Sequence, residues 1–98
     1  MIFYKDSSFE WDDNKNLTNI KKHGISFEEA MTVFDDNALY KPDVDHSQDE
    51  DRFMILGLSI DPQLLVVIHC YKESDTVIRI ISARKATKSE TDQYRGAV

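Results

Sequence analysis

The stretch "LLVVIHCYKESDTVIRIISAR", residues 64–84, decides the fold. It holds two apolar runs rich in β-branched residues, 64–72 and 76–84, which are separated only by the polar tripeptide Glu-Ser-Asp. A similar run, "RFMILGLSI" at 52–60, comes just before them, and "ALYKP" at 38–42 predicts a short fourth strand. Connections this short join antiparallel neighbours, so the sequence predicts an antiparallel sheet of three to four strands.

Helical patterns flank these runs on both sides. In "DDNKNLTNIKKHG", residues 12–24, either of the first two aspartates can cap a helix, and Gly24 suits the position after its last turn. "SFEEAMTVF" at 26–34 and "TKSETDQYR" at 87–95 each begin with a Ser or Thr followed three residues later by Glu, the spacing of a capping box. We therefore predict an α+β fold of two N-terminal helices, the antiparallel sheet and a C-terminal helix.

The composition is that of one globular domain, which we expect to span residues 1–98. Hydrophobic residues make up 41% and charged residues 31%, which argues against disorder. No apolar run approaches the roughly 20 residues of a membrane helix, and the N-terminus lacks the pattern of a signal peptide. A single cysteine, Cys70, excludes an internal disulfide, so we expect a cytoplasmic protein that does not associate with a membrane.

The net charge of −6 hides an uneven distribution along the chain. Residues 1–51 hold 13 acidic and 5 basic side chains, a balance of −8, whereas residues 52–98 hold 5 acidic and 7 basic ones, a balance of +2. The acidic net charge by itself argues against nucleic-acid binding. The uneven distribution nevertheless allows a cationic face in the second half of the chain.

Arg79 interrupts the most strand-like segment of the chain. If Ile78 and Ile80 face the core, alternation turns Arg79 to the other face of the sheet. There it can lie in solvent, pair with an acid from the first half of the chain, or be displayed in a groove floored by the sheet. Arg84 and Lys85 favour the last alternative, because they place two more cations at the end of the same strand.

Metal ligands are not convincing in this sequence. In "DVDHSQDED", residues 43–51, acidic and polar residues alternate as in a calcium loop, but Gln48 replaces the required glycine and Met54 the bidentate glutamate. His69 and Cys70 are adjacent on a strand and must point to opposite faces, so they cannot share a metal. We expect a buried Cys70, a partly exposed His69, and neither a metal nor another cofactor.

Taken together and in this order, several segments resemble the BrnT family of type II toxins. They are "FEWDDNKNLTNIKKHGISFEEAMTVFDD", "DHSQDEDRFMILG", "LLVVIHCY" and "VIRIISARKAT", and they run from Phe9 to Thr87. The resemblance implies a fold similar to the RelE toxins and an endoribonuclease that inhibits translation and growth. It also implies a cognate BrnA-like antitoxin with a ribbon-helix-helix domain, which forms a hetero-oligomer with the toxin and through which the complex reaches operator DNA.

RNA cleavage without a metal requires cations for the phosphate and groups that transfer protons to and from its oxygens. We assign Arg79 and Arg84 to phosphate and transition-state binding, because a guanidinium can hold two phosphate oxygens. Arg52 is expected opposite them on a neighbouring strand, and His46 is the candidate proton shuttle. Further candidates for binding the RNA substrate are Lys22, His23, Lys85 and Lys88.

Two other classes of function remain open. One is a catalytically degenerate module that only binds its antitoxin and acts in promoter autoregulation, which the acidic composition favours. The other is a metal-dependent hydrolase built on the acidic loop at 43–51, which the incomplete ligand pattern disfavours.

Overall fold

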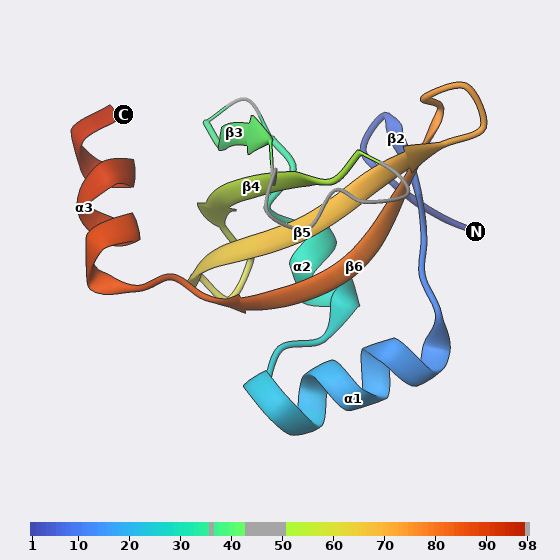
Figure 1. The fold of residues 1–98 in the computed structure, drawn as a ribbon, viewed down its shortest axis with the longest axis horizontal. Coiled ribbons are helices and arrows are strands. Elements are labelled where there is room, and N and C mark those ends of the chain that lie inside the picture. The colour runs from blue at the N-terminus through green and yellow to red at the C-terminus, as the bar shows by residue number, and fades with distance from the viewer. Residues whose placement is uncertain (36, 43–50, 98) are drawn as a thin grey trace.

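The structure is a computed structural model and describes residues 1–35, 37–42 and 51–97 (Figure 1). Its elements, in chain order, are β1 (Ile2–Tyr4), β2 (Ser7–Glu10), α1 (Asp13–His23), α2 (Phe27–Met31), β3 (Leu39–Pro42), β4 (Phe53–Leu58), β5 (Leu64–Lys72), β6 (Val77–Lys85) and α3 (Lys88–Ala97).

In the described part of the chain, the strands form one six-stranded sheet with the order β1-β2-β6-β5-β4-β3. Strands β3 to β6 pair in antiparallel fashion. On the other side of β6 lies β2, which runs parallel to it and places Ser8 opposite Val77 and Glu10 opposite Arg79. The antiparallel β1–β2 pair thus extends the sheet at the edge formed by β6.

The predicted fold class is wrong in its details. Two strands precede α1, and the sheet has six strands in mixed orientation instead of three to four antiparallel ones. The missed strands, β1 and β2, have only 3 and 4 residues, too few to show an alternating apolar pattern. They are held by pairing with each other and with β6, which is distant in sequence. The fold remains α+β, and the described residues form three helices.

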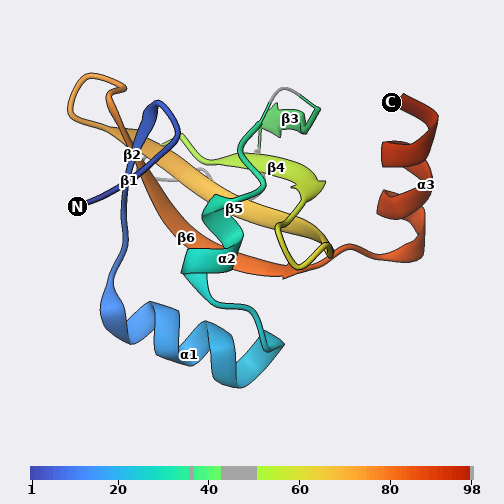
Figure 2. The same cartoon turned by 180° about the vertical axis from the view of Figure 1, so that it is seen from behind.

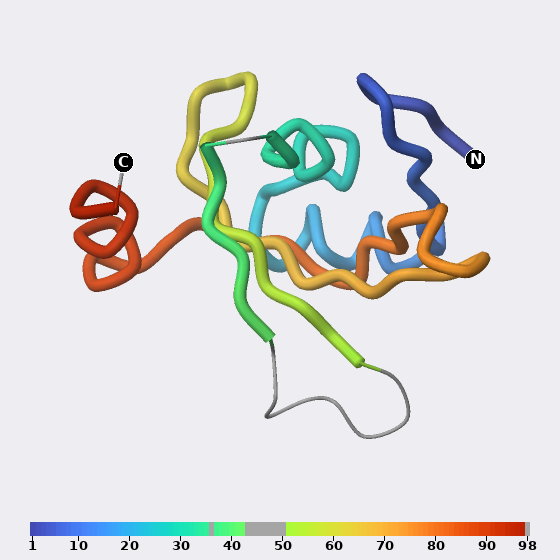
Figure 3. The backbone as a smooth tube through the Cα atoms, turned by 90° about the horizontal axis from the view of Figure 1, so that it is seen from above, coloured from blue at the N-terminus to red at the C-terminus, as the bar shows by residue number. Residues whose placement is uncertain are grey.

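Helix α2 covers one face of the sheet, α1 runs alongside its β6 edge, and α3 stands beyond its end (Figures 1 and 2). The core lies between α2 with its flanking residues and the strands, and its buried residues are Phe9, Ile25, Phe27, Ala30, Val33, Ile55, Leu65, Val67, Ile80 and Ala83. Helix α3 follows the end of β6 and contributes no buried residue of its own (Figure 3). The body of the fold is thus complete without α3.

The helix ends follow the predicted local signals. The Asp12 carboxylate accepts hydrogen bonds from the first turn of α1, at 2.8 Å from Asn14 N and 3.1 Å from Lys15 N. Gly24 ends α1 with a φ of 74°, a conformation in which a residue without Cβ is favoured. Ser26 caps α2 through a hydrogen bond from the Glu29 amide. These signals are predictable because they depend only on neighbours in the sequence.

Asn19 attaches α1 to the edge of β6 that β2 leaves unpaired. Its side-chain amide donates to the carbonyl of Ala83 and accepts from the amide of Ala83, at 2.8 and 3.1 Å, as a neighbouring strand would. It also donates to the carbonyl of Ile25 at 2.8 Å. Because Asn19 is buried, these bonds satisfy backbone groups that would otherwise lose water without a partner.

Candidate nucleic-acid interface

Arg79 and Arg84 lie on the same face of the sheet, the one opposite α2 and the core. Arg79 is paired with Cys70 of β5 and Arg84 with Val66, and four residues separate these two partners on β5. The spacing of five on β6 is accommodated by a β-bulge, which leaves Ile81 without a partner. We call this side of the sheet, defined by Glu10, Arg79, Ser82 and Arg84, the arginine face.

The bulge decides this placement. In a regular strand, two residues five positions apart point to opposite faces, so Arg84 would have joined the core side. Four residues on β5 correspond to about 13 Å between the Cα atoms of the two arginines. The structure thus displays two arginines along one strand, with Cα atoms about 13 Å apart.

Arg79 pairs with Glu10, an acid from the first half of the chain. The parallel register of β2 and β6 places the two residues side by side, and Arg79 Nη1 donates to Glu10 Oε2. Their side chains are 33% and 28% exposed. The alternative of pairing with an acid from the first half is therefore confirmed, and it explains how a cation is accommodated within the strand.

Arg84 is held more firmly, by a carboxylate of α3. Its Nη1 and Nη2 atoms donate to the two oxygens of Glu90 at 2.8 and 2.9 Å, and Nη1 also donates to the Lys85 carbonyl at 3.3 Å. The hydrogen bond from Arg84 is the main reason that the pKa of Glu90 is lowered to about 2. The same bond raises the pKa of Arg84. The pair therefore stays ionised at neutral pH.

Arg52 immediately precedes β4. The first pair of the β4–β5 ladder is Phe53 with His69, so continuing the register by one residue sets Arg52 opposite Cys70. Cys70 is paired with Arg79 on its other side. Arg52 and Arg79 are thus expected near the same end of the arginine face, whereas Arg84 lies near the other end.

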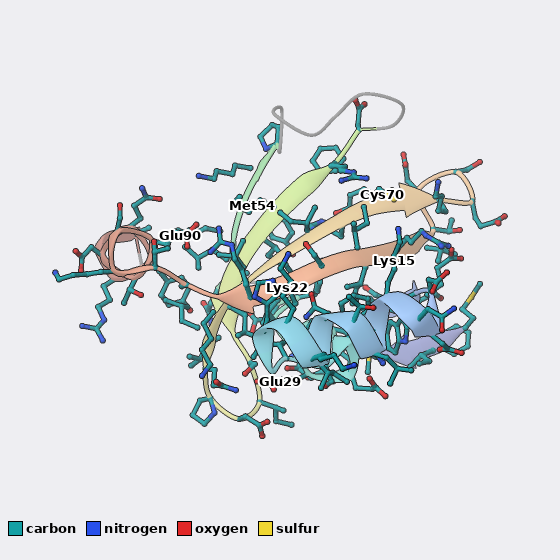
Figure 4. The ribbon with its side chains drawn as sticks, turned by 60° about the horizontal axis from the view of Figure 1, so that its bottom comes forward. Lys15, Lys22, Glu29, Met54, Cys70 and Glu90 are labelled. Carbon is teal, nitrogen blue, oxygen red and sulfur yellow. The ribbon has the colours of Figure 1, made fainter. Side chains whose placement is uncertain are left out.

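The remaining predicted residues lie on other parts of the fold. Lys85 is paired with Leu65, a core residue, so it belongs to the core side of the sheet. Lys22 and His23 lie in the last turn of α1, which runs alongside the β6 edge of the sheet (Figure 4). Lys88 is 91% exposed on α3 and lies 3.5 Å from Asp92. His46 lies outside the described residues.

His69 is fully buried, so the expectation of partial exposure is wrong. It lies on β5, which has neighbours on both sides in the sheet, and its ring contacts Phe34, Phe53 and Tyr71 edge-on or tilted. Burial lowers the pKa of His69 to about 4, against a smaller opposing effect of the Val67 carbonyl. His69 is therefore neutral near pH 7 and lies away from the arginine face. Cys70 is buried, as predicted.

Two acids of the interface, Glu10 and Glu90, were missed as site residues. The capping-box spacing did predict that Glu90 would bind Thr87, and its carboxylate accepts from the Thr87 amide at 2.8 Å. The second use of that carboxylate, on Arg84, has no local signal. The pairing of Glu10 with Arg79 follows from the parallel register of β2 and β6, which the sequence pattern did not show.

The molecule also contains cavities and side chains of the types that bind metals. A cavity of about 930 Å³ has a charged lining of Asp6, Asp35, Asp75 and Lys5, a balance that does not suit phosphate. Met54 and Glu90 (Figure 4) line a smaller cavity, of about 260 Å³, between α3 and the β3–β4 pair.

Within residues 1–35, 37–42 and 51–97, no three His, Cys, Asp or Glu side chains come together as metal ligands. Every helix in these ranges is too short or too polar to cross a bilayer.

The fold resembles that of a solved ribonuclease toxin. The 1.1 Å crystal structure of the Brucella abortus ribonuclease toxin, BrnT, superposes with a TM-score of 0.65. It shares 26% sequence identity, and the match covers 84% of this chain and 99% of that one. Among curated proteins, none matches the chain significantly. The structural match therefore shows that the protein shares the fold of a small ribonuclease toxin.

The sequence defines the family. The family described as "Ribonuclease toxin, BrnT, of type II toxin-antitoxin system" matches residues 11–90. The chain belongs to the BrnT family, which confirms the resemblance seen in the sequence motifs.

Proposed function

We propose that the protein is an endoribonuclease that binds RNA along the arginine face and cleaves it without a metal. The observation that carries this proposal is the placement of Arg79 and Arg84 on one side of the sheet, each fixed by a carboxylate and each partly exposed. Membership of a ribonuclease-toxin family supports RNA as the substrate. The endonucleolytic, metal-independent character is part of the proposal.

The chemistry proposed is attack by the 2′-hydroxyl on the adjacent phosphate. Negative charge develops on the phosphate oxygens, and a guanidinium stabilises it through parallel N–H donors. Arg79 points to Glu10 on β2 and Arg84 to Glu90 beyond the end of β6, so the two guanidiniums diverge. We therefore propose that they contact different phosphates of one RNA strand. Arg52 would assist near Arg79, and His46 remains the candidate proton shuttle.

Incubating the purified protein with RNA in excess EDTA tests this function. We expect degradation, with products that end in 2′,3′-cyclic phosphate, because the 2′-hydroxyl is the proposed nucleophile. Arg79→Ala and Arg84→Ala proteins, purified in the same way, control for contaminating nucleases. A strict requirement for an added divalent ion would contradict the metal-independent mechanism, and 5′-phosphate ends would contradict the proposed nucleophile.

We further propose that a cognate BrnA-like antitoxin of the ribbon-helix-helix type covers the arginine face or blocks access to it. Inhibition requires that RNA be kept from the arginines, and the acidic first half of the chain suits a basic partner. Operator DNA would be reached only through this antitoxin. Higher salt should slow the association of the complex far more than it speeds dissociation, and equal effects on both rates would contradict electrostatic steering.

A second candidate function is supported by the ion pairs themselves. Both arginines already have carboxylate partners, as expected of a catalytically degenerate protein that only binds its antitoxin and acts in promoter autoregulation. The RNA assay in EDTA separates the two functions. This candidate predicts an intact complex with the antitoxin and no cleavage that depends on Arg79 or Arg84.

A further inference from the structure

The hydrogen bonds of Arg84 occupy only part of its guanidinium. A guanidinium carries five N–H donors, two on each Nη and one on Nε. Glu90 takes one donor from Nη1 and one from Nη2, and the Lys85 carbonyl takes a second from Nη1. Among the residues that the structure describes, no acceptor takes the Nε–H or the other Nη2–H, and together these two donors form the side edge of the planar group. The side chain is 38% exposed.

Glu90 is a fixed partner and not a loose counterion. Its carboxylate also accepts from the Thr87 amide at 2.8 Å, and its own amide donates to the Thr87 hydroxyl at 3.2 Å. These bonds close the capping box at the start of α3. Only 16% of the Glu90 side chain is exposed, so the carboxylate has little freedom to turn away.

We propose that Glu90 is a positioning residue, which grips Arg84 by one edge and thereby presents the Nε–Nη2 edge to two oxygens of an RNA phosphate. The two parallel donors of this edge match the spacing of phosphate oxygens. A long side chain loses rotamer freedom when it binds, and Glu90 removes that cost beforehand. The inference rests on the proposed function for its ligand, and it assigns to Glu90 a role in phosphate binding.

In the opposite role, Glu90 would block Arg84 until RNA binds. In that case the phosphate displaces Glu90 from Arg84, and the carboxylate competes with RNA. The two roles predict opposite effects of removing the Glu90 charge. Positioning predicts weaker RNA binding, whereas competition predicts tighter binding, since an anion next to the phosphate is removed.

The test measures binding of a short 2′-O-methyl oligoribonucleotide, which cannot be cleaved through its 2′-oxygen. The variant is Glu90→Gln, and Asp92→Asn is the matched control, because it removes one negative charge from the same helix without touching Arg84. We expect Glu90→Gln to weaken binding about tenfold and Asp92→Asn to leave it within about twofold. Unchanged or tighter binding by Glu90→Gln would overturn the proposal.

A second measurement keeps the test decisive if Glu90→Gln disturbs α3. NMR spectra of the unmodified protein with isotope-labelled arginine and glutamate report Arg84 and Glu90 directly. Titration with the same oligonucleotide should shift the Arg84 Nε–H signal and leave the Glu90 carboxyl signal in place. Movement of the Glu90 signal to that of a solvated carboxylate would show displacement and contradict positioning. If the protein binds RNA in this way but never cleaves it, the proposed function fails while this inference stands.

Discussion

The Arg79–Glu10 and Arg84–Glu90 pairs join the same two kinds of side chain but differ in what they connect. The first lies inside the sheet, between parallel strands, and rests on one hydrogen bond. The second connects a strand to a helix that buries no residue of its own, and it rests on two parallel bonds. The first pair therefore contributes to the sheet itself. The second fixes a side chain and a helix that the core does not hold.

Replacement of either arginine by alanine should have the largest effect. We expect RNA cleavage to fall by roughly 10²–10³ in each variant, because a charged transition-state contact is lost. Because the two ion pairs connect different elements, the two alanine variants should differ in their loss of stability. Arg79→Ala leaves Glu10 without its partner inside the sheet and should lower the melting temperature, whereas Arg84→Ala should loosen only α3.

Growth inhibition, RNA cleavage and thermal unfolding, measured on the same two variants, check this prediction. Circular dichroism spectra of the two variants serve as the control for the fold. Full activity of both alanine variants would exclude the two arginines from the chemistry. Inactivity of Arg79→Ala that follows its melting curve would instead indicate a purely structural role for that residue.

Replacement by lysine should reduce RNA cleavage less than replacement by alanine, and by different factors at the two positions. An ammonium can keep the single contact to Glu10 but not the two parallel bonds to Glu90. We expect Arg79→Lys to retain activity within a fewfold and Arg84→Lys to lose about tenfold. Cleavage rates at saturating and limiting RNA give the comparison, and equal losses at both positions would show that the geometry of the Glu90 contact is unimportant.

The two arginines also show where sequence reasoning succeeds and where it fails. Alternation with Ile80 correctly placed Arg79 away from the core. The same rule, applied over five residues, would have placed Arg84 on the wrong face, because the bulge at Ile81 has no recognisable local pattern. The caps of the helices were predictable from neighbouring residues. The partners of the two arginines were not, since Glu10 depends on parallel pairing across 69 residues and Glu90 on the direction of α3.

His69 illustrates a different limit. Adjacent strand residues point to opposite faces, and the sequence correctly indicated this for His69 and Cys70. It could not show that both residues are buried, His69 at 0% and Cys70 at 1% exposure. Alternation assigns a residue to a face of the sheet, but it does not predict whether a residue of a central strand is exposed there.

Low pH should weaken the α3 contact selectively. The pKa of Glu90 is lowered from 4.5 to about 2, mainly by the bond from Arg84. A lowered pKa in the folded state means that the pair stabilises the protein above about pH 4.5 and loses this effect as the pH falls towards 2. Because the Arg84 side chain is 38% exposed, we expect a contribution on the order of 1 kcal/mol.

Thermal unfolding and helix content, followed between about pH 5 and pH 2, measure this effect. The Glu90→Gln variant is the control, since it has no carboxyl at this position to titrate. Its stability should change less across this range than that of the unmodified protein. Identical curves would show that the pair does not contribute to stability.

The smallest effect is expected at Lys88, which tests whether α3 itself contacts RNA. Lys88 is 91% exposed and lies 3.5 Å from Asp92, so it adds a mobile point charge near Arg84 without a fixed geometry. Lys88→Ala should weaken RNA binding by no more than about twofold and leave the dependence of affinity on salt almost unchanged. A direct phosphate contact would instead reduce the slope of log affinity against log salt by about one. That outcome would extend the RNA interface onto α3. The Arg84–Glu90 pair would then lie at the centre of the interface and not at its end.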